Sequence, residues 1–95
     1  MSAKIKLLGI YQSTQKNKKY VAVFSNGLKI NFGASGYEDY TTHNDHIRKQ
    51  RYILRHSKNE NWNNPYTAGS LSRFILWNKR TLTASINDYK KRFNL

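Results

Sequence analysis

The chain has 95 residues, no cysteine, and 17 Lys and Arg residues against 5 Asp and Glu residues, which gives a formal net charge of +12. The length suits one compact domain with a small core, in which aromatic residues take a large share. The absence of cysteine excludes disulfides, thiolate metal sites and a cysteine nucleophile, and it suits a reducing compartment. No apolar run is long enough for a membrane span, and residues 1–6 lack the apolar stretch of a signal peptide. We therefore expect a single domain over residues 1–95, made and kept in the cytosol or nucleus.

Three segments rich in apolar, β-branched and aromatic residues predict β-strands: residues 4–13, 20–24 and 28–32. The first should be largely buried, and the third alternates apolar and polar residues, as expected of a strand with one wet face. Asn26 and Gly27 between the last two segments predict a two-residue type I′ hairpin, because both tolerate a positive φ. A polar, basic loop over residues 14–19 precedes the second strand. The three strands should form an antiparallel meander.

Three helices are predicted in the rest of the chain: residues 42–57, 71–78 and 82–93. Thr42 nearly completes a capping box with Asp45, and Ser70 and Thr81 are candidate N-caps of the other two helices. Residues 37–40 are expected to form a loop. Because the strands precede the helices, the sequence predicts an α+β fold in which the helices pack on one face of the meander.

The second and third predicted helices should supply most of the helical core. The second is apolar around most of its circumference through Leu71, Phe74, Ile75 and Trp77. The third has one apolar stripe at helical spacing, formed by Leu82, Ile86, Tyr89 and Phe93. We therefore expect the second helix to be the most buried one, with Trp77 in the core.

The cationic residues are the strongest functional signal, because a charge of +12 favours a polyanionic partner such as nucleic acid, an acidic protein or an anionic membrane surface. The first predicted helix has five cations within residues 48–58 and only Asp45 to balance them. They surround its exposed side, so they could reach phosphates or carboxylates, although a merely solvated face would look the same. The predicted polyanion- or partner-binding residues are Lys16, Lys18, Lys19, Arg48, Lys49, Arg51, Arg55, Lys58, Trp62, Arg73, Lys90, Lys91 and Arg92.

Trp62 belongs to this set because it lies among four asparagines, where exposure and a contact role are as plausible as packing. Tyr37, Tyr40 and Tyr66 could likewise stack on bases or anchor an interface. Contact with phosphates is favoured over reading of base sequence, because no helix-turn-helix, zinc-finger or ribonucleoprotein signature is present.

Two patterns in the sequence are candidates for a catalytic or metal site. His43, Asp45 and His46 offer imidazole and carboxylate ligands, but no further ligand follows at a recognised interval, and such residues also cap helices. Residues 9–11 (GIY) and 20–22 (YVA) faintly resemble the paired motifs of GIY-YIG nucleases, yet the second motif lacks its glycine and the carboxylates are few. We predict no enzyme activity, no metal, no cofactor and no small-molecule substrate.

A longer pattern carries a family resemblance. It includes residues 36–43 (GYEDYTTH), residues 60–62 (ENW) and, most specifically, residues 68–77 (AGSLSRFILW). Over about residues 20–93 the chain resembles short basic proteins of unknown function encoded by large and giant nucleocytoplasmic DNA viruses, such as chloroviruses, mimiviruses and their relatives. Arg80 departs from the pattern, which often has proline before the last helix. The resemblance implies a viral protein and a virion component, and it brings no catalytic residues.

Charge and resemblance together predict a non-enzymatic viral structural protein. It would be a virion-associated minor capsid or cement component, made in the host cytoplasm or nucleus, that binds acidic surfaces through its basic helices. The alternative is a non-specific DNA-binding or genome-packaging protein of the virion. The expected partners are therefore viral capsid proteins or DNA.

Overall fold

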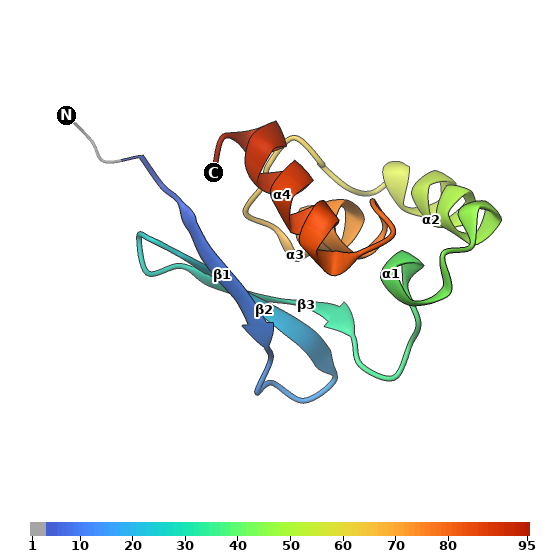
Figure 1. Ribbon diagram of the computed structural model, residues 1–95, viewed down its shortest axis with the longest axis horizontal. Helices are drawn as coiled ribbons and strands as arrows, with labels where there is room; N and C mark the ends of the chain where they lie inside the picture. The colour runs from blue at the N-terminus through green and yellow to red at the C-terminus, as the bar shows by residue number, and fades with distance from the viewer. Residues whose placement is uncertain (1–3) are drawn as a thin grey trace.

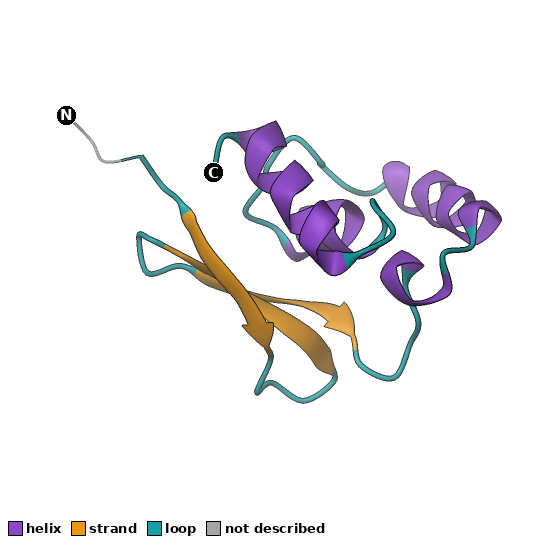
Figure 2. Cartoon of the chain, in the orientation of Figure 1, coloured by secondary structure: helices purple, strands orange, loops and turns teal. Residues whose placement is uncertain are grey.

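The computed structural model describes residues 4–95, and it has the predicted α+β fold: an antiparallel sheet followed by helices (Figure 1, Figure 2). The strands are β1 (Leu7–Gln12), β2 (Lys18–Phe24) and β3 (Lys29–Ala34). The helices are α1 (Tyr40–His43), α2 (His46–Ser57), α3 (Ala68–Leu71), the π-helix η1 (Ser72–Leu76) and α4 (Leu82–Phe93). Residues 1–3, part of the segment predicted to lack a signal peptide, lie outside the described residues.

The sheet has the predicted meander order β1-β2-β3, with differences at its connections. The amide of Phe24 donates to the carbonyl of Leu28 at 2.9 Å, and only Gly27 of the predicted turn pair has a positive φ, of 88°. The hairpin is therefore a three-residue loop that ends in a glycine bulge, and the predicted type I′ turn is wrong. β2 begins at Lys18, which pairs with Ala34 of β3, so Lys18 and Lys19 are strand residues and not part of the preceding loop.

β1 is shorter than the predicted segment and only partly buried. The register between β1 and β2 shifts between Leu7 and Gly9, and Leu8 at this irregularity is 61% exposed. A bulge turns the extra side chain away from the alternating pattern, which explains why the expected burial of this strand is incomplete.

The predicted loop at residues 37–40 contains the beginning of a helix. The Asp39 carboxylate accepts from the Thr41 amide at 2.9 Å, and the Thr42 hydroxyl accepts from the Asp39 amide at 3.0 Å, so these residues form a capping box for α1. Asn44 has a φ of 52°, which ends α1, and Asp45 caps α2. The prediction of one helix from Thr42 is therefore wrong, because the capping box begins at Asp39.

The next helix also begins earlier than predicted. Thr67, not Ser70, caps α3, while the Ser70 hydroxyl donates to the carbonyl of Asn64 at 2.6 Å. α3 continues directly into η1, which ends at Leu76. The Asn78 side chain donates to the carbonyl of Phe74, in place of the backbone bond of a continued α-helix. The last prediction is confirmed, because Thr81 caps α4.

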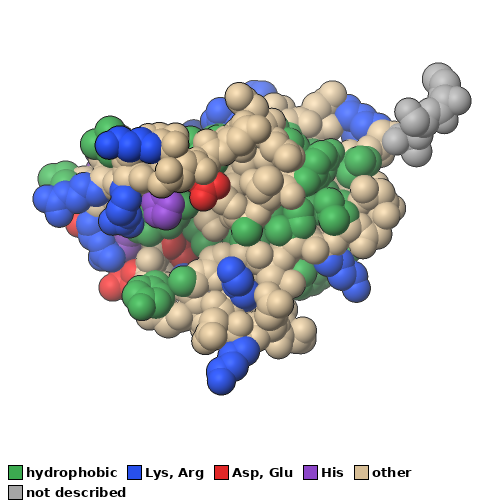
Figure 3. Space-filling view, turned by 180° about the vertical axis from the view of Figure 1, so that it is seen from behind, with side chains coloured by type: hydrophobic (Ala, Val, Ile, Leu, Met, Phe, Trp, Pro, Cys, Tyr) green, Lys and Arg blue, Asp and Glu red, His purple; other side chains and the backbone are tan. Residues whose placement is uncertain are grey.

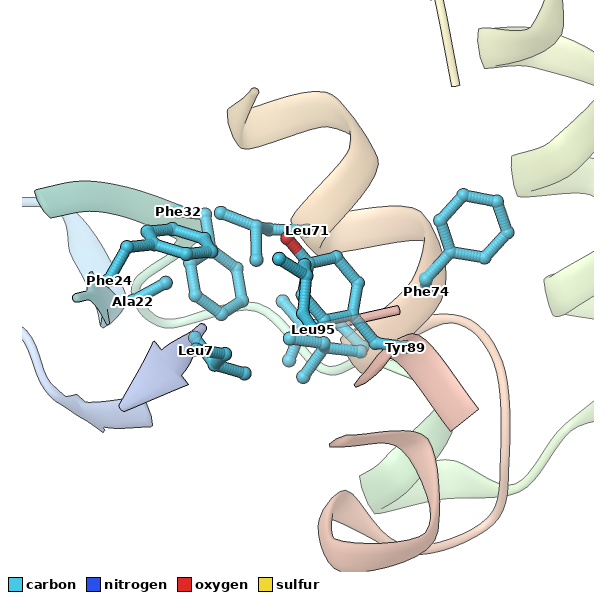
Figure 4. Packing of buried hydrophobic residues seen from close by; sticks show 10 residues of the cluster. Leu7, Ala22, Phe24, Phe32, Leu71, Phe74, Tyr89 and Leu95 are labelled. Atoms are coloured by element: carbon cyan, nitrogen blue, oxygen red, sulfur yellow. The ribbon is translucent and has the colours of Figure 1, made fainter. Parts of the chain in front are cut away.

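The core lies between the sheet and the pair formed by α3–η1 and α4 (Figure 4). Phe24 and Phe32 point from the sheet toward Leu71 and Tyr89, and these four side chains are almost completely buried. Trp77 is half-buried rather than enclosed, since it packs at the edge of this core. None of the described helices is long and apolar enough to cross a bilayer.

Two helices lie outside the helical layer that was expected on one face of the sheet. α1 and α2 lie beyond the end of the sheet and not over its face (Figure 1). The segment between β3 and α1 takes the chain past the sheet, and the Lys19 ammonium fixes it there through the carbonyl of Tyr37 at 2.6 Å and the carboxylate of Asp39 at 2.7 Å.

The ion pair between Lys19 and Asp39 should stabilise the fold measurably, because Asp39 is 2% exposed and also caps α1. Asp39→Ala is expected to lower the free energy of unfolding by about 2–3 kcal/mol, since it leaves a half-buried ammonium unpaired and removes a helix cap. Asp39→Asn keeps an oxygen for the cap and should lose less. Urea unfolding measures both variants, and equal stability of Asp39→Ala and the wild type would contradict the role of this pair.

Candidate functional site

Helix α2 is attached to the rest of the molecule by an inner stripe of side chains. Tyr52, 8% exposed, stacks on Trp77 with ring centroids 4.5 Å apart and planes 4° apart, and His56 stacks on Tyr52 at 4.3 Å. The Lys49 ammonium donates to the carbonyl of Asn78 at 2.6 Å and lies over the ring of Tyr40. Burial, reinforced by the charges of Arg73 and Lys79, lowers the pKa of Lys49. Lys49 is thus a structural contact between α2 and the loop after η1.

Three exposed arginines follow one another along the next side of α2. Arg48, Arg51 and Arg55 are spaced by three and four residues, so their side chains form a row, here called the cationic stripe. None of them has an acidic partner, because the ion pairs within residues 4–95 are those of Lys19 with Asp39 and of Arg92 with Asp88. Their guanidinium groups are therefore available to an external anion.

The side of α2 farthest from the core is apolar. Ile47 is 64% exposed and Leu54 is 68% exposed, and helical spacing aligns them with the exposed Lys58; these three residues are called the outer stripe. The cationic stripe lies between the outer stripe and the aromatic inner stripe. Ile47 and Leu54 therefore add exposed apolar area beside the cationic stripe.

A cleft of about 650 Å³ opens between α2, the end of the sheet and α3. The cationic stripe, Tyr52 and His56 line it from α2. The opposite side is lined by residues at the end of the sheet and in the segment that follows, among them Lys18, Lys19, Tyr37 and Glu38. In Figure 3, Lys and Arg side chains gather at the left of the molecule beside a hollow in which His, acidic and hydrophobic side chains are visible.

The electrostatics of the cleft are set by arginines and by a few acids. Burial and the nearby charge of Glu60 raise the pKa of Tyr52 to about 12, so its hydroxyl stays protonated at neutral pH. Tyr52 is one of the residues that line the cleft from α2. Glu60 packs against Gly69, where a Cβ would push its carboxylate aside.

Four of the predicted binding cations are engaged inside the chain. Lys19 and Lys49 make the contacts described above. Arg73 is half-buried and donates to the carbonyl of Trp77 at 2.8 Å, and Arg92 bonds to Asp88 at 3.3 Å while lying over the ring of Phe74. Burial, reinforced by the charge of Arg92, lowers the pKa of Arg73. These groups have less freedom to bind a partner than the sequence suggested.

Trp62 is half-buried and packs on the helical core. Its ring meets Phe74 edge-on with centroids 6.5 Å apart, and the guanidinium of Arg73 lies 5.5 Å from its centroid. Trp62 Nε1 and Arg73 Nε are both buried and have no hydrogen-bond partner among residues 4–95. The Trp62 ring therefore serves mainly in packing. The sequence alone was compatible with either packing or contact with a partner.

The remaining predicted cations are exposed: Lys16, Lys18, Lys58, Lys90 and Lys91. Lys18 lines the cleft, Lys16 lies in the loop before β2, and Lys58 follows α2. Lys90 and Lys91 lie on α4 and do not line the cleft. The predicted set is thus divided between the cleft and other surfaces, and only the cationic stripe and Lys18 meet there as exposed cations.

Sequence reasoning did not identify Tyr52 and His56 as parts of one site with the arginines. The signal was their spacing, because position 52 is one turn from Arg48 and Arg55, and His56 is one turn from Tyr52. Glu60 and Tyr37 join the same cleft through tertiary contacts that helical spacing does not encode.

The two patterns weighed as chemical sites occupy ordinary structural positions. His43 Nδ1 accepts from the Asp45 amide, and Asp45 caps α2. No cluster of three potential metal ligands occurs within residues 4–95. The GIY and YVA segments pair side by side on β1 and β2, but Tyr11 and Tyr20 are not among the residues that line the cleft with Arg48 and Glu60.

A sequence profile described as "Family of unknown function (DUF5754)" matches residues 8–56, just over half of the chain. The chain belongs to the DUF5754 family. The DUF5754 match runs from β1 into α2 and includes the whole cationic stripe, whereas α3, η1 and α4 lie beyond it. No curated protein and no solved structure matches the chain.

Proposed function

We propose that this DUF5754 protein is a non-enzymatic structural protein that binds an acidic surface through α2, as a minor capsid or cement component of a virion. The observation that carries the proposal is the composition of the exposed side of α2. Three arginines without acidic partners lie beside the exposed Ile47 and Leu54. Guanidinium groups bind carboxylates through paired hydrogen bonds, and the exposed apolar residues beside them can add the apolar contact that protein interfaces contain.

The viral part of the proposal is supported by the resemblance described above. It covers about residues 20–93 and therefore includes α2 and most of the residues that line the cleft. Proteins of this size and charge suit contacts inside a shell, because a small basic domain can join neighbouring acidic surfaces without a large core of its own.

Non-specific DNA binding or genome packaging is the second candidate function. It is favoured by the exposed Lys16, Lys90 and Lys91, which spread positive charge over surfaces away from α2. A net charge of +12 attracts any polyanion over a distance of about a Debye length, without the need for one shaped site.

Salt dependence separates the two candidates. Anisotropy with a random-sequence DNA duplex should show weak binding at about 50 mM salt if the partner is a protein. A DNA-packaging protein would bind tightly and lose roughly a thousandfold in affinity at about 200 mM, as expected for six or more phosphate contacts. Tight binding that collapses in this way would contradict the capsid assignment.

A second measurement tests the protein partner directly. The protein should co-sediment with empty capsid shells of a large icosahedral DNA virus, and the double variant I47S/L54S should lose this retention while it keeps any affinity for duplex DNA. Both side chains are exposed, so the variant should fold normally. Shell binding that is indifferent to both substitutions, or absent in the wild type, would contradict the proposal.

A further inference from the structure

We infer that the cleft beside α2 binds a single-stranded nucleic-acid segment, with phosphates on the cationic stripe and a base against the rings of His56 and Tyr37. This goes beyond the proposed function, because the ligand enters the cleft and does not use the outer stripe. The inferred nucleic-acid site and the proposed capsid contact share the arginines of α2, so the test below is designed to distinguish these two kinds of binding.

The spacing of the cationic stripe suits contacts with the phosphates of a nucleic-acid strand. Arg48 and Arg55 are two turns apart, about 10 Å along the helix axis, and Arg51 lies between them. A nucleic-acid strand that runs along the cationic stripe would meet one guanidinium group at each turn of α2. Glu38 and Glu60 line the same cleft, yet neither forms an ion pair with these arginines. No acid within residues 4–95 therefore neutralises these guanidinium groups through an ion pair.

Aromatic side chains beside the cationic stripe form a surface on which a base can stack. Trp77, Tyr52 and His56 form a continuous column, with neighbouring centroids 4.5 and 4.3 Å apart, and His56 is its last member in the cleft. Tyr37 lines the opposite side; its side chain is 74% exposed while Lys19 holds its carbonyl. A base placed on His56 would extend the column, which is how proteins bind single strands without reading their sequence.

The dimensions and polar groups favour one unpaired nucleotide. A volume of about 650 Å³ lies within the range of sites for small ligands, and it cannot take a base that remains stacked and paired in a duplex. Tyr52 also lines the cleft, and its protonated hydroxyl is a possible donor to a phosphate or to a base carbonyl. Glu60 can accept from the amino group of a base, but its charge opposes the approach of phosphate. An acidic peptide would satisfy the arginines and leave the exposed ring of Tyr37 and the half-buried ring of His56 without a stacking partner.

The test is anisotropy of a fluorescein-labelled ten-nucleotide oligo(dT) at about 50 mM salt. The double variant Y37A/H56A should weaken binding by about 10- to 100-fold, because it removes both stacking surfaces. Glu60→Gln should strengthen binding, since it removes a negative charge from the cleft. Tyr11→Ala is the matched control: Tyr11 is also an exposed tyrosine, but it lies on β1 outside the cleft, so its loss should leave affinity unchanged.

His56 also contacts Tyr52, so Tyr37→Ala alone serves as a second variant that cannot disturb α2. It should weaken binding by several-fold. Unchanged oligo(dT) affinity in both cleft variants would overturn the inference, and so would a decaglutamate peptide whose binding depends equally on these rings. If the cleft does not bind single strands, capsid shells should still lose the protein when Ile47 and Leu54 are replaced. If instead the proposed function is wrong, shell binding should not depend on Ile47 and Leu54, while oligo(dT) binding should still depend on Tyr37 and His56.

Discussion

Reversing the charge of the cationic stripe, in the triple variant R48E/R51E/R55E, is expected to reduce binding to every acidic partner by at least about a hundredfold. Three favourable contacts become like-charge repulsions, which cost several kcal/mol when they meet a carboxylate or phosphate. Each reversal changes the net charge by two, so the variant carries +6 in place of +12. The fold should persist, because the three side chains are exposed and form no ion pair within residues 4–95.

The matched control is K16E/K90E/K91E, which changes the net charge by the same amount at exposed residues away from the cleft. It should weaken binding only moderately, through the loss of long-range attraction. Titration of both variants against duplex DNA, oligo(dT) and capsid shells measures the difference. Equal losses in the two variants would mean that binding follows net charge alone and is not localised to α2.

Truncating Tyr89 is expected to be the most destabilising substitution in the helical core. The side chain is fully buried, meets Phe93 edge-on at 5.3 Å and donates its hydroxyl proton to the carbonyl of Pro65 at 2.7 Å. Tyr89→Ala should cost about 3–5 kcal/mol, since it leaves a large cavity. That is a major part of the total stability of a domain of this size.

Tyr89→Phe separates the hydrogen bond from the packing. It keeps the ring but leaves the Pro65 carbonyl without its donor, so it should cost about 1–3 kcal/mol. Burial raises the pKa of Tyr89, and therefore the phenol stays protonated and the loss should not vary over neutral pH. Urea unfolding measures both variants. Equal stability of Tyr89→Phe and Tyr89→Ala would contradict a large contribution from ring packing.

The elements that could be predicted from the sequence are those whose signal is local. The YVAVF run formed the central strand, and the stripe from Leu82 to Phe93 formed α4 behind its Thr81 cap. Capping was ambiguous elsewhere because several polar residues competed for it. Asp39 and Thr67 cap the helices assigned to Thr42 and Ser70, and each of the latter hydroxyls has another partner in the folded chain.

Only part of the candidate site could be predicted from the sequence. The concentration of cations on α2 could be read directly, but the sequence did not show which of them lie free. Lys49 turns inward because it meets Asn78 and Tyr40, which come from other segments. The cleft itself arises only when the end of the sheet and α2 are brought together. Its depth and its ring column therefore depend on tertiary contacts.

The attachment of α2 through a single stripe has an evolutionary consequence. Tyr52 is the one buried residue of this helix, and the residues of the cationic and outer stripes are exposed. Substitutions on those stripes should change folding stability by no more than about 0.5 kcal/mol. Selection can therefore remodel this face to follow a changing partner while the sheet, α3–η1 and α4 keep the scaffold constant.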